Sequence, residues 1–196
     1  MAVAGQARIK FGTAVGQLKP PLSDGLMTQE APSRGGAPFA QEDFMTQHPS
    51  LKSRDLSMTV LMTPDMVNFS GNVHGGAMLK LLDQVAYACA VRYSGRYAVT
   101  LAVEKVLFKQ PVHVGELATF LARINHVGRT SMEVGIKVVT ENPRDGQCRH
   151  VMSCFFYMIS VDENRKPVEL EAFTPETEAD KERWAAALKR KETLSA

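Results

Sequence analysis

The longest apolar segment of the chain covers residues 77–91, where hydrophobic residues fall on every face of a helix rather than on one stripe. Before it stand Asn68, Ser70, Gly71 and Asn72, residue types that favour turns, so a helix cannot begin before His74 or Gly75. A helix that is hydrophobic all round is surrounded by other elements. We therefore predict a long central helix.

Shorter segments on both sides alternate hydrophobic and polar residues, as half-buried strands do. The first is residues 56–62, and four more follow the helix at residues 98–109, 116–127, 130–141 and 149–161. The turns between them have the Gly, Pro, Asn and Asp residues of antiparallel connections. The element order βαββββ predicts an α+β fold in which a curled antiparallel sheet of about five strands wraps around the helix.

The chain divides into three parts by composition. Residues 1–52 are rich in Pro and Gly without hydrophobic periodicity, which predicts a flexible tail, although a weak organellar transit peptide is an alternative. Residues 53–166 form the predicted domain. In the extension, residues 167–196, acids precede bases after Pro175, which predicts a helix at about 175–191.

Length and charge limit the possible functions. The chain has 196 residues and a net charge of +2 at pH 7 without a basic stripe, which argues against nucleic acid as a partner. Lys80, Asp83 and Gln84 interrupt the best candidate for a transmembrane segment. We expect no membrane span and a cytoplasmic protein.

Cysteine and histidine spacing gives no metal motif. Cys89, Cys148 and Cys154 are unpaired in spacing and lie in apolar surroundings, which is typical of core thiols in a reducing compartment. The five histidines have no paired spacing. We predict no metal and no disulfide.

Asp83 is the one carboxylate in the apolar helix. Such a group is costly unless it is paired or used, and an ion pair with Lys80 on a narrow solvated stripe is one interpretation. The other is catalytic, because Gly75 and Gly76 place backbone N–H groups at the positive end of the helix dipole, where they can bind an oxyanion. A base and an oxyanion site suggest acyl transfer or hydrolysis.

Three motifs, taken together, carry a family resemblance. They are NFSGNVHGG at residues 68–76 with Lys80 and Asp83, FKQPVHVGE at residues 108–116, and VGRTSM at residues 127–132. With these motifs, residues 54–165 resemble hotdog-fold acyl-CoA thioesterases, in particular the cytosolic acyl-CoA hydrolase type that forms hexamers from dimers. The resemblance implies a hotdog fold and hydrolysis of fatty acyl-CoA to free CoA and a carboxylic acid.

The resemblance also implies roles for single residues. Asp83 would be the catalytic carboxylate, Asn68 its partner across the subunit interface, and Gly75 and Gly76 the groups that bind the thioester carbonyl. His74 is either a general base, a helix cap or part of the turn.

The same resemblance implies a CoA site at the turn between two strands. Its residues would be Gly128, Arg129, Thr130 and Ser131, although a hairpin turn with a solvated Arg is the alternative. CoA is then part of the substrate, and no separate cofactor is expected.

The acyl chain needs an apolar pocket beyond the carboxylate. Small side chains at Ala86 and Ala90 would leave room for it, and packing of these alanines against a strand is the alternative. Cys89 is not expected to be a nucleophile, because apolar surroundings raise the pKa of a thiol.

The site requires more than one helix. Gly76 and Asp83 are seven residues apart, roughly 10 Å along a helix axis, so one helix cannot bring both to the same reacting group. Two antiparallel copies would, which predicts a homodimer as the minimal active unit. The resemblance extends this to a trimer of dimers.

Several alternatives stay open from the sequence. Asp83 either activates water or attacks the carbonyl to form an anhydride. A non-catalytic acyl-CoA sensor or a hydratase/dehydratase could share the fold. The sensor would require a DNA-binding motif in residues 1–52, whose composition argues against one.

Overall fold

The computed structural model describes residues 52–194. Its elements are β1 (Asp55–Leu61), the 3-10 turn η1 (Pro64–Met66), α2 (Gly75–Ser94), β2 (Tyr97–Phe108), β3 (Leu117–Val127), β4 (Ser131–Glu141), β5 (Cys148–Val161) and α3 (Glu178–Leu194). The five strands predicted from the hydrophobic pattern are confirmed, each with its ends within one residue. The predicted tail falls outside the described residues except for Lys52.

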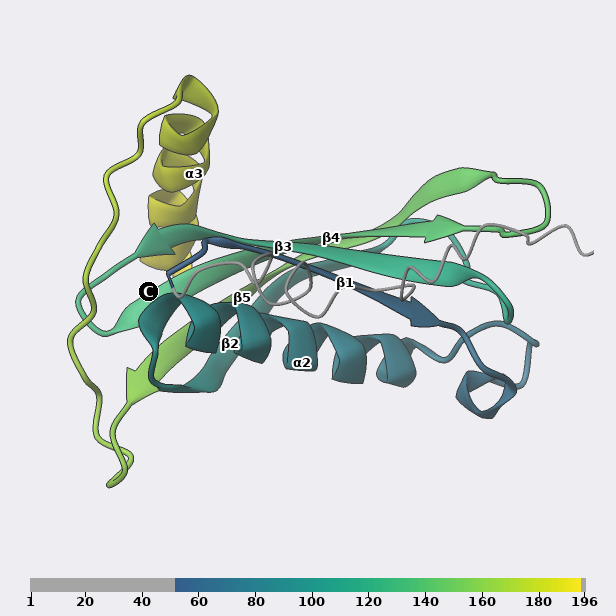
Figure 1. The fold of residues 1–196 in the computed structure, drawn as a ribbon, viewed down its shortest axis with the longest axis horizontal. Coiled ribbons are helices and arrows are strands. Elements are labelled where there is room, and N and C mark those ends of the chain that lie inside the picture. The colour runs from purple at the N-terminus through teal and green to yellow at the C-terminus, as the bar shows by residue number, and fades with distance from the viewer. Residues whose placement is uncertain (1–51, 195–196) are drawn as a thin grey trace, which may run out of the picture. The chain divides into compact units, whose positions relative to one another are not determined.

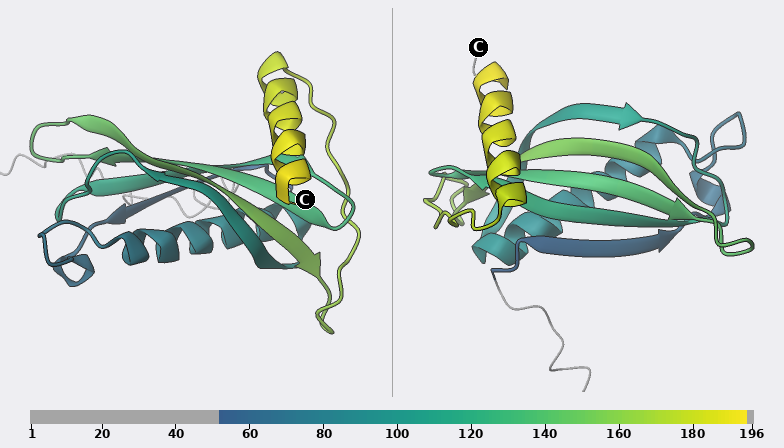
Figure 2. Two further views of the ribbon diagram at one scale, coloured as in Figure 1. Left: turned by 180° about the vertical axis from the view of Figure 1, so that it is seen from behind. Right: turned by 90° about the horizontal axis from the view of Figure 1, so that it is seen from above.

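The strands form one antiparallel sheet in the order β1-β3-β4-β5-β2. Helix α2 lies along one face of the sheet, and α3 stands on the opposite face (Figures 1 and 2). β1 and β2 are the two edge strands. The predicted α+β architecture, with a curled five-stranded sheet and one long helix against it, is confirmed.

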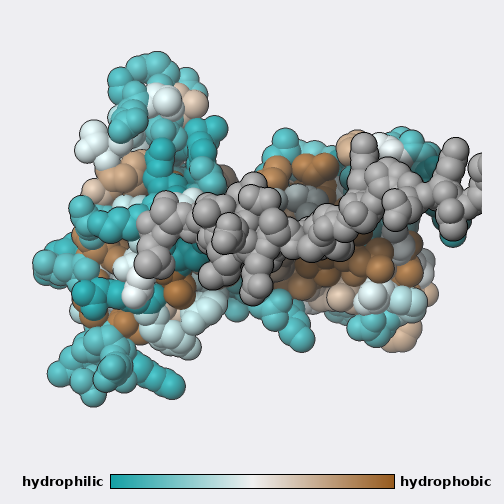
Figure 3. All heavy atoms as spheres, in the orientation of Figure 1, coloured by the Kyte–Doolittle hydropathy of each residue, from teal (hydrophilic) through white to brown (hydrophobic). Residues whose placement is uncertain are grey.

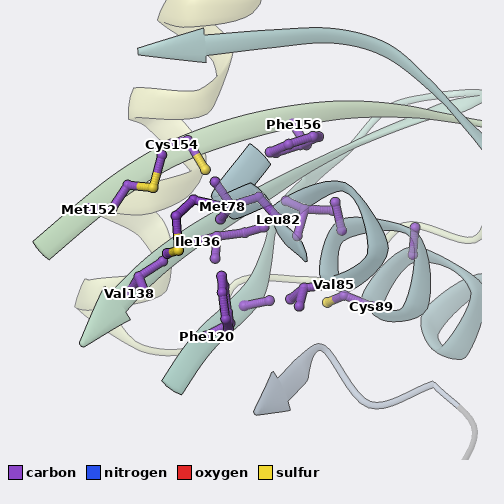
Figure 4. Packing of buried hydrophobic residues seen from close by; sticks show 14 of the residues in the cluster. Met78, Leu82, Val85, Cys89, Phe120, Ile136, Val138, Met152, Cys154 and Phe156 are labelled. Carbon is purple, nitrogen blue, oxygen red and sulfur yellow. The ribbon is translucent and has the colours of Figure 1, made fainter. Parts of the chain in front are cut away.

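The core lies between α2 and the facing side chains of the central strands. Alternate residues of each strand point toward the helix, because successive side chains of a strand lie on opposite faces. Figure 4 shows this packing, in which side chains of α2 contact those of β3, β4 and β5. The labelled residues are Met78, Leu82, Val85 and Cys89 from the helix, and Phe120, Ile136, Val138, Met152, Cys154 and Phe156 from the strands.

One expectation about α2 is wrong within the single chain. The sheet buries one face of the helix, including Leu82 and Val85, but the face with Leu79, Asp83 and Tyr87 stays exposed. On the side seen in Figure 3, hydrophobic residues gather near the first half of α2, whereas α3 is largely hydrophilic. The apolar residues of α2 therefore lie on two faces. The sheet of the same chain covers one face, and the other face is open in the single chain.

α3 begins at Glu178, three residues later than the predicted start at Pro175. The Thr177 hydroxyl accepts a hydrogen bond from the Asp180 N–H (3.1 Å), which is the contact of a helix N-cap. Thr177 therefore fixes the start, and Pro175 lies in the segment before it. The helix is anchored to the sheet by the buried ion pair of Arg190 with Glu133.

Candidate active site

The turn before α2 is held by the side chain of Asn68. Its Oδ1 atom accepts hydrogen bonds from the N–H groups of Ser70 (2.9 Å) and Asn72 (3.2 Å), and its own N–H donates to the Asn72 carbonyl (2.8 Å). Among residues 52–194 the Asn68 side-chain NH₂ group has no hydrogen-bond partner. Asn68 therefore shapes the turn with its oxygen and keeps its donors available.

His74 caps the start of α2. Its Nδ1 atom accepts a hydrogen bond from the Gly76 N–H (2.8 Å), so the helix-cap interpretation describes its role in this structure. This bond occupies one of the two amides predicted to bind the thioester carbonyl. The Gly75 N–H, in contrast, has no partner among the described residues. Gly75 thus carries the open donor at the positive end of the helix.

Phe108 packs against the same helix start. A Cβ atom added to Gly75 would lie 3.3 Å from Phe108 Cζ, which is tighter than ordinary van der Waals contact. A side chain at position 75 would therefore require the exposed Phe108 ring to shift by a few tenths of an ångström. Phe108 thus lies directly beside the residue that carries the open amide.

Asp83 lies on the exposed face of α2 and is oriented by β2. The Thr100 hydroxyl donates a hydrogen bond to Asp83 Oδ1 (2.7 Å). Lys80, Asp83 and Gln84 are all exposed, as the interpretation as a solvated stripe predicts. No ion pair joins Asp83 to Lys80 in the described part of the chain, so that part of the interpretation is wrong. The carboxylate is held in place by a neutral donor.

Sequence reasoning missed Thr100. A single threonine in an alternating strand gives no signal, because strands are rich in threonine for packing reasons. Only the placement of β2 beneath α2 brings the hydroxyl to the carboxylate. Thr100 is therefore an added member of the candidate site.

A groove runs beside Asp83 between α2 and β2. Its volume is about 450 Å³. The lining residues are Asp83, Gln84, Tyr87, Tyr97, Ala98, Val99 and Thr100. The rings of Tyr87 and Tyr97 meet edge to face with centroids 5.7 Å apart. The groove is therefore lined by the Asp83 carboxylate and by two aromatic rings.

The two alanines proposed for the acyl pocket lie elsewhere. Ala86 and Ala90 are both 0% exposed and belong to the core cluster between α2 and the sheet. Neither lines the groove beside Asp83. Within the single chain they follow the alternative interpretation, in which small side chains let the helix pack closely on the strands.

The turn at residues 128–131 connects β3 to β4. The Gly128 N–H donates to the Ser131 carbonyl (2.7 Å), and the exposed Arg129 side chain lies 3.8 Å from a carboxylate oxygen of Glu169. Thr130 uses its carbonyl to accept from the Ser160 N–H (3.0 Å). These contacts are those of an ordered hairpin turn, and the CoA-binding role stays a prediction.

The register of the sheet relates this turn to Asp83. Thr100 pairs with Met158, and Met158 pairs with Met132, which follows the turn directly. Two strand spacings, roughly 10 Å, therefore separate Thr100 from the strand that begins at Ser131. A molecule as long as CoA can reach from one to the other.

Cys89 and Cys154 are buried, whereas Cys148 near the start of β5 is exposed, so the prediction of a core thiol is wrong for Cys148. The two buried thiols are poor nucleophiles. Burial raises the pKa of Cys89 and that of Cys154 to about 12. Among residues 52–194 no group of three or more His, Cys, Asp or Glu side chains is placed to hold a metal ion. The same residues contain no helix long and apolar enough to cross a membrane.

Comparison with known proteins places this chain in a family. Residues 70–147 match the model of the thioesterase superfamily. Protein VdlD of Helicobacter pylori is 49% identical over 137 residues, which span 70% of this chain and 78% of that protein. An uncharacterized acyl-CoA thioester hydrolase of Zymomonas mobilis is 30% identical over 114 residues, 58% of this chain and 76% of that protein.

A solved structure shares the fold at similar identity. The apo form of a hexameric acyl-CoA thioesterase superposes with a TM-score of 0.69 at 30% identity, covering 74% of this chain and 93% of that one. The chain therefore belongs to the thioesterase superfamily and, within it, to the hotdog-fold acyl-CoA thioester hydrolases. The resemblance found in the three motifs is confirmed, and the protein is a thioester hydrolase.

Proposed function

We propose that this protein hydrolyses the thioester of acyl-CoA to free CoA and a carboxylic acid, with Asp83 as the catalytic carboxylate. The supporting observation is the placement of Asp83 on the open face of α2, fixed by Thr100 and bordered by a groove. A carboxylate in this position can take a proton from water as the water attacks the carbonyl, or attack the carbonyl itself. In the second route water then cleaves the resulting anhydride.

In the proposed site, the oxyanion that forms on the thioester carbonyl accepts a hydrogen bond from the Gly75 N–H. Gly75 and Asp83 of one chain cannot both reach this group, because eight positions (75 to 83) on a helix span roughly 12 Å. The amide therefore comes from a second copy of α2 that runs antiparallel to the first. Asn68 of that second copy would direct its free NH₂ group toward Asp83.

The exposed edge strand supports such a dimer. Among residues 52–194, β2 has no neighbouring strand on its outer side, and its Leu101, Leu107 and Phe108 side chains are 63%, 57% and 54% exposed. An unpaired strand edge with large apolar side chains favours association with another chain. We propose that β2 and the open face of α2 form the dimer interface, and that dimers assemble into a trimer of dimers.

Subunit complementation tests the shared site. Asp83→Ala and Asn68→Ala proteins should each be inactive alone. After subunit exchange, a mixed dimer has one site with both lesions and one with neither, so activity should approach half that of wild type per mixed dimer. A failure to recover activity despite proven exchange would show that each site is built within one chain.

Two further properties belong to the proposal. The assembly is tested by the molar mass of the full chain in solution, where a dimer that does not associate further would contradict the trimer of dimers. Three free cysteines favour a reducing location such as the cytoplasm. Fractionation of cells that produce the protein tests this, and an organellar location would overturn it.

A further inference from the structure

A buried ion pair lies behind the start of α2. Arg149 of β5 donates through Nη2 to Glu116, and the two side chains are only 18% and 8% exposed. Glu116 directly precedes β3, at the end of the loop that follows β2. A buried pair of this kind is weak evidence for stability, because desolvation offsets the attraction. Its further contacts indicate what else it does.

Each member of the pair holds a backbone group next to Val112. Arg149 Nη1 donates to the Pro111 carbonyl (3.2 Å), and the His113 N–H donates to Glu116 Oε2 (3.0 Å). Val112 lies between these two contacts and is buried. The ion pair therefore clamps the backbone on both sides of Val112.

The clamped residue supports the turn that leads into the helix. The Val112 carbonyl accepts a hydrogen bond from the Val73 N–H (2.8 Å), and Asn72 forms a bridge with His113. Val73 stands two positions before Gly75, and His74 between them is the helix cap. A continuous set of contacts thus runs from the ion pair to the open Gly75 amide.

We propose that Glu116 and Arg149 are positioning residues for the reaction, because they fix the backbone that aims the Gly75 N–H and the Asn68 side chain. The inference rests on the proposed function, in which these two groups contact the reacting carbonyl and the partner's carboxylate. A misplacement of about 1 Å in such a group can lower a rate by about 10²-fold. Arg149 contacts Glu116 through Nη2 and the Pro111 carbonyl through Nη1, and an ammonium lacks this fixed fork, so lysine is not an equivalent replacement.

The structure also supplies a matched control pair. Glu133 and Arg190 form a second buried ion pair, with side chains 1% and 12% exposed, which joins the sheet to α3. Glu133 also accepts a hydrogen bond from Asn125 (3.0 Å). None of these contacts involves the turn before α2. Loss of either pair should lower stability, but only loss of the first should disturb the reaction.

The experiment compares Arg149→Lys and Glu116→Gln with Arg190→Lys and Glu133→Gln in the full chain. We measure kcat, KM and Tm for an acyl-CoA substrate at a temperature where all four proteins are folded. The first two variants should lose about tenfold or more in kcat with KM within about twofold. The control variants should show a similar loss of Tm with kcat within about twofold of wild type.

The Glu116→Gln variant keeps the design testable if Arg149→Lys does not fold. This substitution is milder than a deletion, because the amide keeps the shape of the side chain and one acceptor for Arg149. It removes the negative charge of the ion pair and the acceptor for the His113 N–H. If both pairs change Tm alike and none of the variants changes kcat, the positioning role is overturned. Near-wild-type activity of Asp83→Asn would instead overturn the proposed role of Asp83. The kcat of Arg149→Lys relative to wild type is measured separately, so the two failures can be told apart.

Discussion

The two faces of α2 differ in what covers them. Leu82 and Asp83 are neighbours in sequence, yet Leu82 is 0% exposed against the sheet and Asp83 is exposed to the groove. The covered face consists of apolar side chains that interlock with β3, β4 and β5. The open face mixes Leu79 and Tyr87 with Asp83. A face that leaves Leu79 and Tyr87 uncovered is suited to contact another surface, and it also carries Asp83, the carboxylate that we propose as catalytic.

The largest expected effect comes from removing the carboxylate on the open face. Asp83→Asn should lower kcat by about 10²–10⁴-fold, because the amide can neither accept a proton from water nor attack the carbonyl. Stability should stay near that of wild type, since the side chain is exposed. Steady-state kinetics and thermal unfolding check both parts, and a near-wild-type kcat would contradict the assignment.

The neighbouring change on the covered face should have the opposite outcome. Leu82→Ala should lower the free energy of unfolding by about 2–5 kcal/mol, because it leaves a cavity in the core. Activity per folded molecule should change little. Urea unfolding with a parallel assay tests this, and a strong loss of kcat in fully folded protein would show that the two faces are not separable.

A smaller effect is expected from the residue that orients the carboxylate. Thr100→Val removes the hydroxyl that donates to Asp83 while keeping the shape of the side chain. A hydrogen bond to a charged group contributes about 1.5–3 kcal/mol, so kcat should fall by about 10- to 100-fold. Thr100→Ser is the matched control and should retain most activity. Equal kinetics for the two variants would exclude the orienting role.

Substitutions on the two faces of α2 should differ in their effect on the preferred length of the acyl chain. We propose that the groove beside Asp83 holds the acyl chain, and Tyr87 lines it. Tyr87→Ala should therefore widen the groove and shift preference toward longer acyl groups. Ala86→Leu should instead cost about 1–3 kcal/mol of stability by overpacking the core. A series of acyl-CoA substrates measures the first effect. A changed profile in folded Ala86→Leu would return the acyl pocket to the buried alanines.

The mildest test uses the thiols. Cys148 is exposed, whereas Cys89 on the covered face and Cys154 in the sheet are buried with a pKa raised by burial to about 12. Only thiolates react readily, so one thiol per native chain should be labelled quickly at pH 8 and three after unfolding. Rapid labelling of Cys89 would mean that the covered face opens easily.

The sequence alone determined the elements of this fold and pointed to several residues of the candidate site. Strands and helix have different hydrophobic periods, and turns have their own residues, so local pattern was enough to place β1 to β5 and α2. The start of α2 at Gly75 followed from the turn residues between Asn68 and Asn72. Asp83 was identifiable because a carboxylate in an apolar helix is exceptional.

Only the tertiary structure decided which groups meet. The contact of Thr100 with Asp83 and the Glu116–Arg149 pair join residues that are far apart in the chain. The hydrogen bond to the Gly76 amide depends on the rotamer of the His74 side chain. Such contacts produce no periodic pattern in the sequence. The burial of Ala86 and the exposure of Asp83 likewise depend on which face of α2 the sheet covers. The sequence of a helix that is apolar on every face does not show which face the sheet covers. Apolar residues suit a face that packs on the sheet and equally a face that contacts another surface.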